Sequence, residues 1–344
     1  MRLDPIVGRK VLIAEDRAKR PNDYSPIVFA GESFASSGAT AGACPFCAGH
    51  EHQTPPSLVE MLDEQGRWQV RVVANKFPAV SGSPAENPAE NLPGDFQPRP
   101  VESVLPAPQQ ALGVQEVVIE SPLHVRDFSD LSLHQVAAVL QVYRERLRHW
   151  ADEGRLRHAL AFKNVGLAAG ASLEHIHGQL MALPYVPTAV AEELAGAGRY
   201  YDRRGKCVFC QLVQEEFQQR VRLVAEEGPF VAFCAYAGRQ PYETWILPTA
   251  HAPRFERLTD QESMSLAKIF QQVLGRLGHQ LSPLSYNLIL HTSPFQGDCE
   301  DYYHWHWELI PRTCPLAGLE WGAGVFINPL SPEQAARLLQ KVKI

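Results

Sequence analysis

The chain has 344 residues, of which 45% are hydrophobic, and its 32 basic and 38 acidic side chains give a net charge of -6. This length favours two domains over one, and without a basic excess nothing indicates binding to nucleic acid or to an anionic membrane. The first residues lack an apolar segment of signal-peptide length, and no run of about 18 apolar residues occurs elsewhere. We therefore expect a cytoplasmic protein with no membrane partner.

Residues 68–122 predict two strands separated by a long loop. Residues 68–80 (WQVRVVANKFPAV) form a β-branched run that leads into a turn, and residues 115–122 (QEVVIESP) form a second such run. Residues 81–113 between them are dense in Pro, Ala and Asn, a composition that favours a surface loop over a regular element.

Apolar residues at helical spacing predict three helices. The first covers residues 131–154, with a stop signal at Gly154. The second covers residues 259–281, with Thr259 suited to the N-cap position. The third covers residues 331–342, with Ser331 as N-cap and Pro332 at the first helical position.

An internal repeat links the two halves of the chain. A C-x-x-C pair occurs at residues 44–47 and again at 207–210, and an H-x-H pair occurs at 175–177 and again at 304–306. Between them, EVVIESPLH at 116–124 corresponds to ETWILPTAH at 243–251, and each is followed by one of the long helices. Three features in the same order indicate a duplicated unit, with a boundary near residues 186–204.

The repeat predicts an α+β fold of two tandem domains. We place them at residues 1–190 and 191–344, and each is expected to be a mostly antiparallel sheet with helices on one face. A doubly wound fold fits this order of elements less well, because several strands precede each helix.

The duplicated cysteines and histidines predict two metal sites. A structural zinc needs four thiolate or imidazole ligands in a tetrahedron, and each C-x-x-C supplies two. A redox pair or two buried thiols would explain a single C-x-x-C, but two with matching downstream histidines favour zinc. The remaining ligands of the first site would be His124 and one histidine of 175–177, and those of the second would be His251 and one of 304–306.

Two further histidines, His50 and His52, lie close to the first C-x-x-C but have no counterpart in the second half, so we assign them to the surface.

The spacing of His175 and His177 in ASLEHIHGQ at 171–179 allows the two histidines to have different roles. Alternate residues of a strand share a face, but a turn at this Gly-rich entry would separate them. One histidine could then bind metal while the other faces a cleft.

These motifs resemble the galactose-1-phosphate uridylyltransferase family of the histidine-triad superfamily. The resemblance rests on RAKRP at 17–21, CPFC at 44–47, VRVVANKFPAV at 70–80, FKNVGLAAGAS at 162–172 and ASLEHIHGQ at 171–179. It covers almost the whole chain in order and implies tandem histidine-triad-like domains. It also implies a double displacement, in which a histidine attacks the α-phosphorus of a nucleoside diphosphate sugar and then passes the nucleotidyl group to a second sugar 1-phosphate.

By this resemblance, His177 is the nucleophile and Gln179 binds the phosphate of the covalent intermediate. The first zinc is implied to bind Cys44, Cys47, His124 and His175. The implied substrate-binding residues are Arg17, Arg20, Asn75, Asn164, Ser172 and Glu320.

The second half departs from the bacterial uridylyltransferases, whose second metal site uses a glutamate and three histidines. His291, His304 and His306 match those histidines, but the second C-x-x-C matches the ADP-glucose phosphorylase branch. We therefore predict that the second zinc binds Cys207, Cys210, His251 and His304. At the hexose-binding end Glu320 is kept, whereas Phe326 stands where the family has a glutamine.

The resemblance implies a UDP-glucose–hexose-1-phosphate uridylyltransferase. The alternatives are an ADP-sugar phosphorylase, a dinucleoside polyphosphate phosphorylase, and a zinc-stabilised nucleotide-binding module without activity. The intact His177 and Gln179 argue against the module, which would not need a nucleophile. The family commonly forms dimers whose active sites borrow residues across the interface, so we also expect a homodimer.

Overall fold

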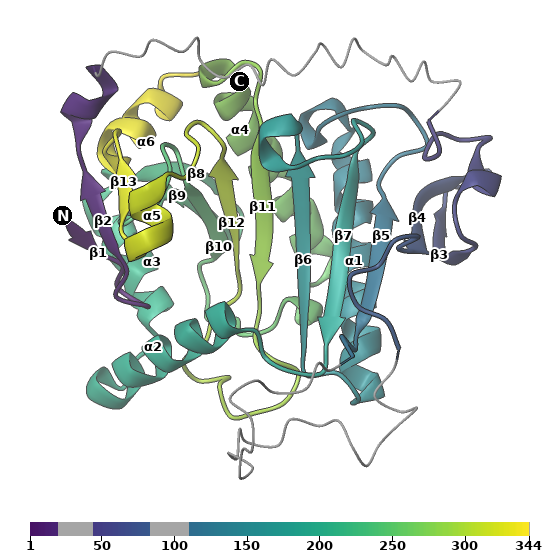
Figure 1. Ribbon diagram of the computed structural model, residues 1–344, viewed down its shortest axis with the longest axis horizontal. Coiled ribbons are helices and arrows are strands. Elements are labelled where there is room, and N and C mark those ends of the chain that lie inside the picture. The colour runs from purple at the N-terminus through teal and green to yellow at the C-terminus, as the bar shows by residue number, and fades with distance from the viewer. Residues whose placement is uncertain (20–43, 83–109, 344) are drawn as a thin grey trace.

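The computed structural model describes residues 1–19, 44–82 and 110–343, and a ten-stranded antiparallel sheet dominates them (Figure 1). The part of the loop predicted at 81–113 that spans 83–109 lies outside the described residues. Across the sheet the strands are β3 (Ser57–Leu62), β4 (Trp68–Ala74), β5 (Val114–Ile119), β7 (His177–Leu183), β6 (His158–Val165), β11 (Tyr286–His291), β12 (His306–Pro311), β10 (Thr244–Pro248), β9 (Phe230–Cys234) and β8 (Leu223–Glu227).

The strand order confirms the duplication that the sequence predicts. Reading inward from one edge gives β3-β4-β5-β7-β6, and reading inward from the other gives β8-β9-β10-β12-β11. The two halves meet where β6 pairs with β11 in antiparallel register, with Asn164 opposite Asn287. The halves therefore share one continuous sheet, and the fold class is α+β as expected.

The three predicted helices are present and pack on the same face of the sheet. They are α1 (Leu133–Glu153), α4 (Asp260–Gln280) and α6 (Pro332–Gln340), and their apolar residues join the strands in one large core. Gly154 ends α1 with a φ of 69°, a left-handed conformation that glycine adopts without strain. Thr259 caps α4 through its side chain, in a capping box with Glu262.

The sequence predicts neither the longer helices α2 and α3 nor the short helix α5 (Gly318–Ala323). α2 (Thr188–Arg204) occupies the segment predicted as the domain boundary, so the division at residue 190 remains a prediction. α3 (Val208–Gln219) packs on the opposite face from α1 and α4, where Phe209 lies 6.3 Å from Trp245 between ring centroids. Helices therefore cover both faces of the second half rather than one.

A small sheet lies at the edge of the molecule beside the second half (Figure 1). It consists of β1 (Arg2–Leu3), β2 (Lys10–Ile13) and β13 (Phe326–Asn328), next to α5 (Gly318–Ala323). Short 3-10 helices complete the described elements, at Glu15–Lys19, Glu51–Gln53, Phe128–Asp130, Leu167–Ala169 and Phe255–Arg257. Among the described helices, none combines the length and the hydropathy that crossing a bilayer requires.

Candidate active site and metal centres

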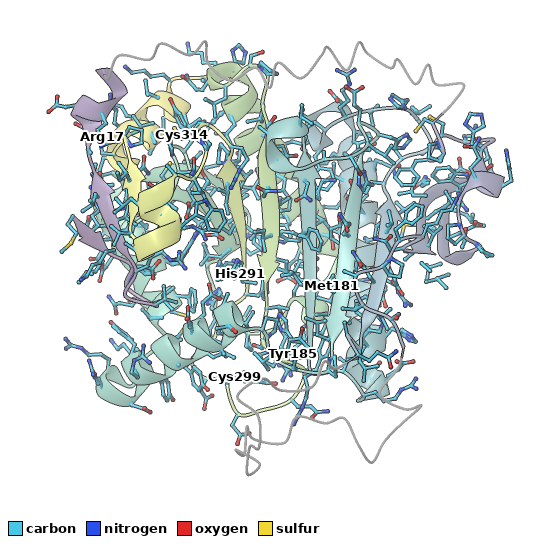
Figure 2. All side chains as sticks on the ribbon, in the orientation of Figure 1. Arg17, Met181, Tyr185, His291, Cys299 and Cys314 are labelled. Carbon is cyan, nitrogen blue, oxygen red and sulfur yellow. The ribbon has the colours of Figure 1, made fainter. Side chains whose placement is uncertain are left out.

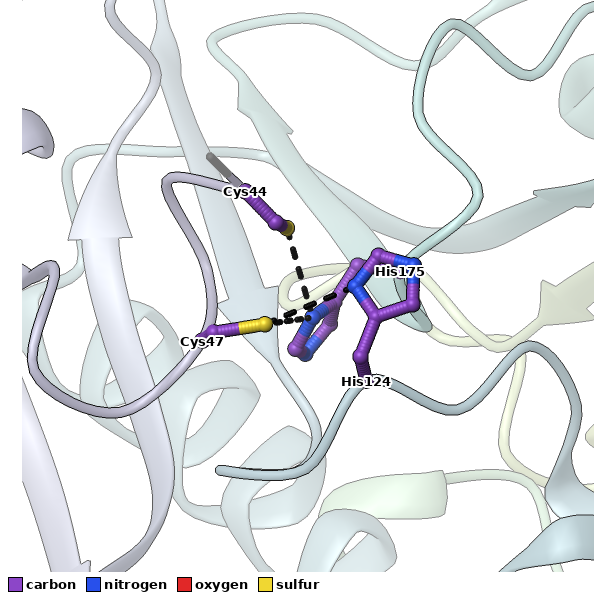
Figure 3. A group of neighbouring side chains, drawn as sticks. All are labelled: Cys44, Cys47, His124 and His175. Carbon is purple, nitrogen blue, oxygen red and sulfur yellow. Dashed lines mark hydrogen bonds between the residues drawn. The ribbon is translucent and has the colours of Figure 1, made fainter. Parts of the chain in front are cut away.

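The four residues predicted for the first zinc converge on one point (Figure 3). The Sγ atoms of Cys44 and Cys47 each lie 3.5 Å from Nδ1 of His175, and Cys47 Sγ lies 3.4 Å from Nδ1 of His124. A tetrahedral zinc with bonds of about 2.3 Å to sulfur and about 2.0 Å to nitrogen separates such atoms by about 3.5 Å. The donor set therefore fits zinc.

The surroundings of His175 also suit a metal ligand. Its Nε2 donates to the carbonyl oxygen of Ser121 at 2.9 Å, which leaves Nδ1 unprotonated and turned toward the cysteines. Burial lowers the pKa of His175 to about 4, so its ring is neutral at neutral pH. As predicted, His50 and His52 stay outside the set: His50 donates to the Cys44 carbonyl at 2.7 Å, and His52 is exposed.

The second predicted set repeats this arrangement. Cys210 Sγ lies 3.3 Å from Nδ1 of His251 and 3.5 Å from Nδ1 of His304, and Cys207 completes the group. The other nitrogen of His304 donates to the carbonyl of Pro248 at 3.0 Å, in the same way as His175 does to Ser121. This donor set fits zinc on the same grounds as the first.

Three further donors, Glu193, His291 and His306, lie close together in the second half. His291 is held between two carboxylates, with Nδ1 3.1 Å from Glu193 and Nε2 3.4 Å from Glu308. Burial lowers the pKa of His291, but the two carboxylates outweigh burial and raise it to about 10. Because His304 belongs to the cysteine set, the glutamate and three histidines of the bacterial uridylyltransferase site do not all meet here, although Glu193, His291 and His306 still form a group that could hold a metal ion. Glu193 and His291 form an ion pair, and His306 donates from Nδ1 to the carbonyl of His304 at 3.2 Å.

His177 begins β7, while His175 lies in the turn before it, so the two imidazoles separate as predicted. Nδ1 of His177 donates to the carbonyl of His175 at 2.8 Å, which leaves the lone pair on Nε2. Burial lowers the pKa of His177, its bond to His175 opposes this, and the Lys163 cation adds to the lowering. The result is a neutral imidazole with one nitrogen able to attack an electrophile.

Gln179 is oriented by a residue that the sequence did not single out. Gln115, on the adjacent strand β5, donates from Nε2 to Oε1 of Gln179 at 3.1 Å. The backbone carbonyl of Gln115 accepts a hydrogen bond from the backbone N–H of Asn75 at 2.9 Å. Gln115 thus joins two predicted site residues. Only the strand register shows this contact, and the sequence carries no motif for it.

Asn164 and Ser172 lie around the loop between β6 and β7. Asn287 donates to Oδ1 of Asn164 at 2.8 Å across the junction of the two halves, and this bond orients the Asn164 amide. Gly166 and Gly170 shape this loop with positive φ angles, and Ser172 is exposed on it. Asn287 is a second residue that the sequence did not single out.

Arg17 and Glu320 lie together, but apart from His177. Burial tends to raise the pKa of Glu320, but backbone hydrogen bonds at Glu320, Ala317 and Ile327 and the positive charge of Arg17 together lower it. In Figure 2 Arg17 is at one end of the molecule, whereas Met181 of the His177 strand is across the sheet. Within one chain the predicted site residues therefore fall into two separate groups. Arg20 lies outside the described residues.

Comparison with known proteins decides the family. Residues 1–187 match the family model described as galactose-1-phosphate uridyl transferase, N-terminal domain, and residues 193–312 match that of its C-terminal domain. The chain belongs to the galactose-1-phosphate uridyl transferase family. Membership makes it an enzyme of the nucleotidyltransferase class, as the sequence predicts.

Two branches of this family are represented among the relatives. An ADP-glucose phosphorylase from Arabidopsis thaliana is 32% identical over 346 residues, covering 100% of this chain and 93% of its own length. A galactose-1-phosphate uridylyltransferase from Thermotoga maritima is 25% identical, covering 100% of this chain and 98% of its own.

Solved structures show the same two branches. The crystal structure of the Arabidopsis ADP-glucose phosphorylase with bound ADP-glucose superposes with a TM-score of 0.84 at 30% identity, covering 100% of this chain and 99% of that chain. A uridylyltransferase structure gives a TM-score of 0.71 at 30% identity, covering 98% and 96%.

Proposed function

We propose that this enzyme transfers a nucleotidyl group from a nucleoside diphosphate sugar to a phosphate-bearing acceptor, through a covalent intermediate on His177. The observation that carries the proposal is the hydrogen bond from Nδ1 of His177 to the His175 carbonyl. It fixes the tautomer in which Nε2 is the nucleophile, and it stabilises the positive charge that the ring gains when Nε2 bonds to phosphorus.

In the first step, Nε2 of His177 attacks the α-phosphorus, and the bond to the sugar 1-phosphate breaks. In the second step, an oxygen of the acceptor phosphate attacks the same phosphorus, and the bond to His177 breaks. Gln179 would donate from its amide nitrogen to a phosphate oxygen, because its Oε1 is already occupied by Gln115. Asn75, Asn164 and Ser172 are proposed to bind the nucleotide.

We propose zinc at both cysteine–histidine sets. When bound, each zinc would crosslink four side chains from separate segments and so fix the local backbone. In the first set this backbone includes His175, whose carbonyl holds His177. The unpaired state of all seven cysteines suits a reducing compartment, and we place the enzyme in the cytoplasm.

Two reactions of the family compete for this chain. Uridylyl transfer between UDP-glucose and a hexose 1-phosphate is the reaction that the sequence motifs imply. Phosphorolysis of an ADP-sugar is the second candidate, and the Cys207–Cys210 set together with the higher TM-score to the ADP-glucose phosphorylase favours it. Both would use the same covalent step on His177.

The separation of Arg17 and Glu320 from His177 supports a homodimer. We propose that these two residues, with Arg20, reach the active site of a second copy and bind the acceptor phosphate and the sugar there. The two domains at residues 1–190 and 191–344 would then have different tasks, with the nucleophile in the first.

The test is to incubate the protein separately with UDP-glucose and ADP-glucose that carry ³²P at the α-position. Label on the protein from UDP-glucose, discharged by galactose 1-phosphate, would establish uridylyl transfer. Label from ADP-glucose, discharged by inorganic phosphate, would establish the phosphorylase. Absence of label from both would refute the covalent mechanism.

A further inference from the structure

A network of three buried polar side chains lies beneath β7, the strand that carries His177. Lys163 of β6, Glu120 just after β5 and Tyr143 of α1 are all inaccessible to solvent. The Lys163 ammonium pairs with the Glu120 carboxylate, and the Tyr143 hydroxyl donates to that carboxylate. Lys163 also donates to the backbone carbonyl of His177 at 3.2 Å. The network therefore reaches the nucleophile through its main chain.

The same network contacts the next residue, Gly178. A Cβ atom added there would overlap the Tyr143 hydroxyl and would lie 2.9 Å from Oε1 of Glu120. Only a glycine lets β7 lie this close to the polar group. Two consecutive residues, His177 and Gly178, thus rest on the Lys163–Glu120–Tyr143 network.

The second half of the chain builds the equivalent layer without charged groups. Tyr143 lies eleven residues after Ser132, the N-cap of α1, and Phe270 lies eleven residues after Thr259, the N-cap of α4. Phe270 is fully buried in the same core as Tyr143. The duplicated helix therefore places a ring of the same shape there, but without the hydroxyl.

Strand register extends the comparison to the other positions. Phe162 pairs with Gln179 in the first half, so Lys163 follows next to Gly178 if the register continues, and Leu290 pairs with Trp307 in the second half. Leu290 and Trp307 are fully buried, and Phe270 packs edge-on against Trp307 with ring centroids 5.5 Å apart. The second half has Trp307 and Glu308 where the first half has Gly178 and Gln179, and it fills this layer with uncharged side chains.

The comparison shows that the fold does not require these ions. A buried ion pair must overcome the loss of hydration of both groups, and apolar residues of similar size often stabilise a core at least as well. Burial raises the pKa of Glu120 and lowers that of Lys163, and the charge of each opposes this shift in the other. The first half keeps a costly arrangement where the second half does without it.

We propose that Lys163, held by Glu120 and Tyr143, is a positioning residue that fixes the backbone of His177 and thereby aims its Nε2. His177 is then held from two directions, because its ring is bound to the His175 carbonyl and its own carbonyl is bound to Lys163. This inference rests on the proposed function, in which Nε2 must lie in line with the leaving sugar 1-phosphate.

The test removes both charges together, as Lys163→Met with Glu120→Gln, so that neither partner is left buried alone. The matched control is Arg146→Met with Glu116→Gln. This double variant removes a different ion pair, which joins α1 to β5. Metal content and thermal unfolding of both double variants are measured first. The single-turnover rate of nucleotide labelling and the affinity for the nucleotide sugar are measured next.

We expect the Lys163 double variant to retain two zincs and to label at least about tenfold more slowly, with less than about threefold change in affinity. The control should label at the wild-type rate. Nitrogen-15 spectra of histidine-labelled protein add a readout that does not need activity. The signal of His177 should report one Nδ1-protonated tautomer in the wild type and a mixture in the Lys163 double variant.

A folded, zinc-replete Lys163 double variant with an unchanged labelling rate would overturn the proposal, and so would a slower rate with an unchanged His177 spectrum. If the double variant does not fold, Tyr143→Phe, which copies Phe270, replaces it with the same two readouts and the same criteria. If no nucleotide sugar labels the wild type, the proposed function fails, while the spectra still decide whether Lys163 positions His177.

Discussion

The side chain of Gln115 donates to Oε1 of Gln179 at 3.1 Å, and this contact decides which end of the Gln179 amide is free. Oε1 of Gln115 accepts from the amide of Ala79 at 2.8 Å, so Gln115 itself has one orientation. The amide nitrogen of Gln179 is therefore the donor that we propose binds a phosphate oxygen. Which end of the Gln179 amide is free is set by Gln115 on β5, the strand next to the one that carries His177.

Replacing Gln115 with alanine should slow nucleotide labelling about tenfold, because the Gln179 amide loses the partner that orients it. Gln65→Ala, in an exposed turn, is the control and should label at the wild-type rate. The measurement is the single-turnover rate with radiolabelled nucleotide sugar. Equal rates for the two variants would show that Gln115 does not orient Gln179 for catalysis.

Each cysteine–histidine set should hold one zinc. Metal analysis of the purified protein should give about two zincs per chain, and Cys44→Ser or Cys210→Ser should each reduce this to about one. Cys314→Ser, outside both sets, should keep two. Only the Cys44 variant should also lose nucleotide labelling, because its zinc fixes the segment that holds His177. One zinc or none in the wild type would contradict the duplicated site.

The pair formed by Glu193 and His291 predicts a pH dependence of stability. The pKa of His291 is raised from 6.5 to about 10, so its contribution is complete below pH 6.5 and is lost as the pH rises through about 10. The pKa of Glu193 is lowered from 4.5 to about 2, so its contribution is complete above pH 4.5 and is lost toward pH 2. The pair should stabilise most between pH 4.5 and 6.5.

His291→Gln should therefore lower the free energy of unfolding by ~3 kcal/mol at about pH 6, because it leaves the Glu193 carboxylate without its cationic partner. The loss should shrink as the pH is raised toward 10. His279→Gln, on an exposed position of α4, is the control. Denaturant unfolding across this pH range is the measurement, and a loss that grows with pH would show that His291 is not held as a cation.

Active sites shared between two copies should show complementation. Arg17→Ala and His177→Ala are each expected to be inactive alone, because one lacks the arginine proposed to bind the acceptor and the other lacks the proposed nucleophile. Mixing the two under conditions that exchange subunits should restore about a quarter of wild-type activity, since a mixed dimer carries one intact site. No recovery from a mixture that demonstrably forms mixed dimers would place both residues in the same copy's site.

Much of the architecture could be predicted because its determinants are local. Thr259 and Gly154 mark helix ends through capping and a left-handed φ, and both are readable without tertiary structure. The metal sets could be predicted because the repeat supplies the same ligands twice. His175 and His177 could be expected to face different directions because a turn before a strand breaks the two-residue alternation.

The remaining features depend on register and on packing between distant segments. Gln115, Lys163 and Glu120 carry no motif, and their contacts with β7 follow only from which residues the sheet places side by side. No sequence pattern predicts that Arg17 lies across the sheet from His177. The helix α2 was missed because its polar residues and glycines resemble a linker in composition.

The proposed mechanism depends on a covalent nucleotidyl-histidine at His177. The most direct measurement is mass spectrometry of the protein after brief incubation with ADP-glucose or UDP-glucose, followed by peptide mapping at alkaline pH, where a phosphoramidate survives. We predict the added mass of one nucleoside monophosphate on the peptide that contains His177, with none in His177→Ala, while His134→Ala, on the exposed face of α1, carries the adduct as the wild type does. An adduct on another residue, or one that persists in His177→Ala, would contradict the account.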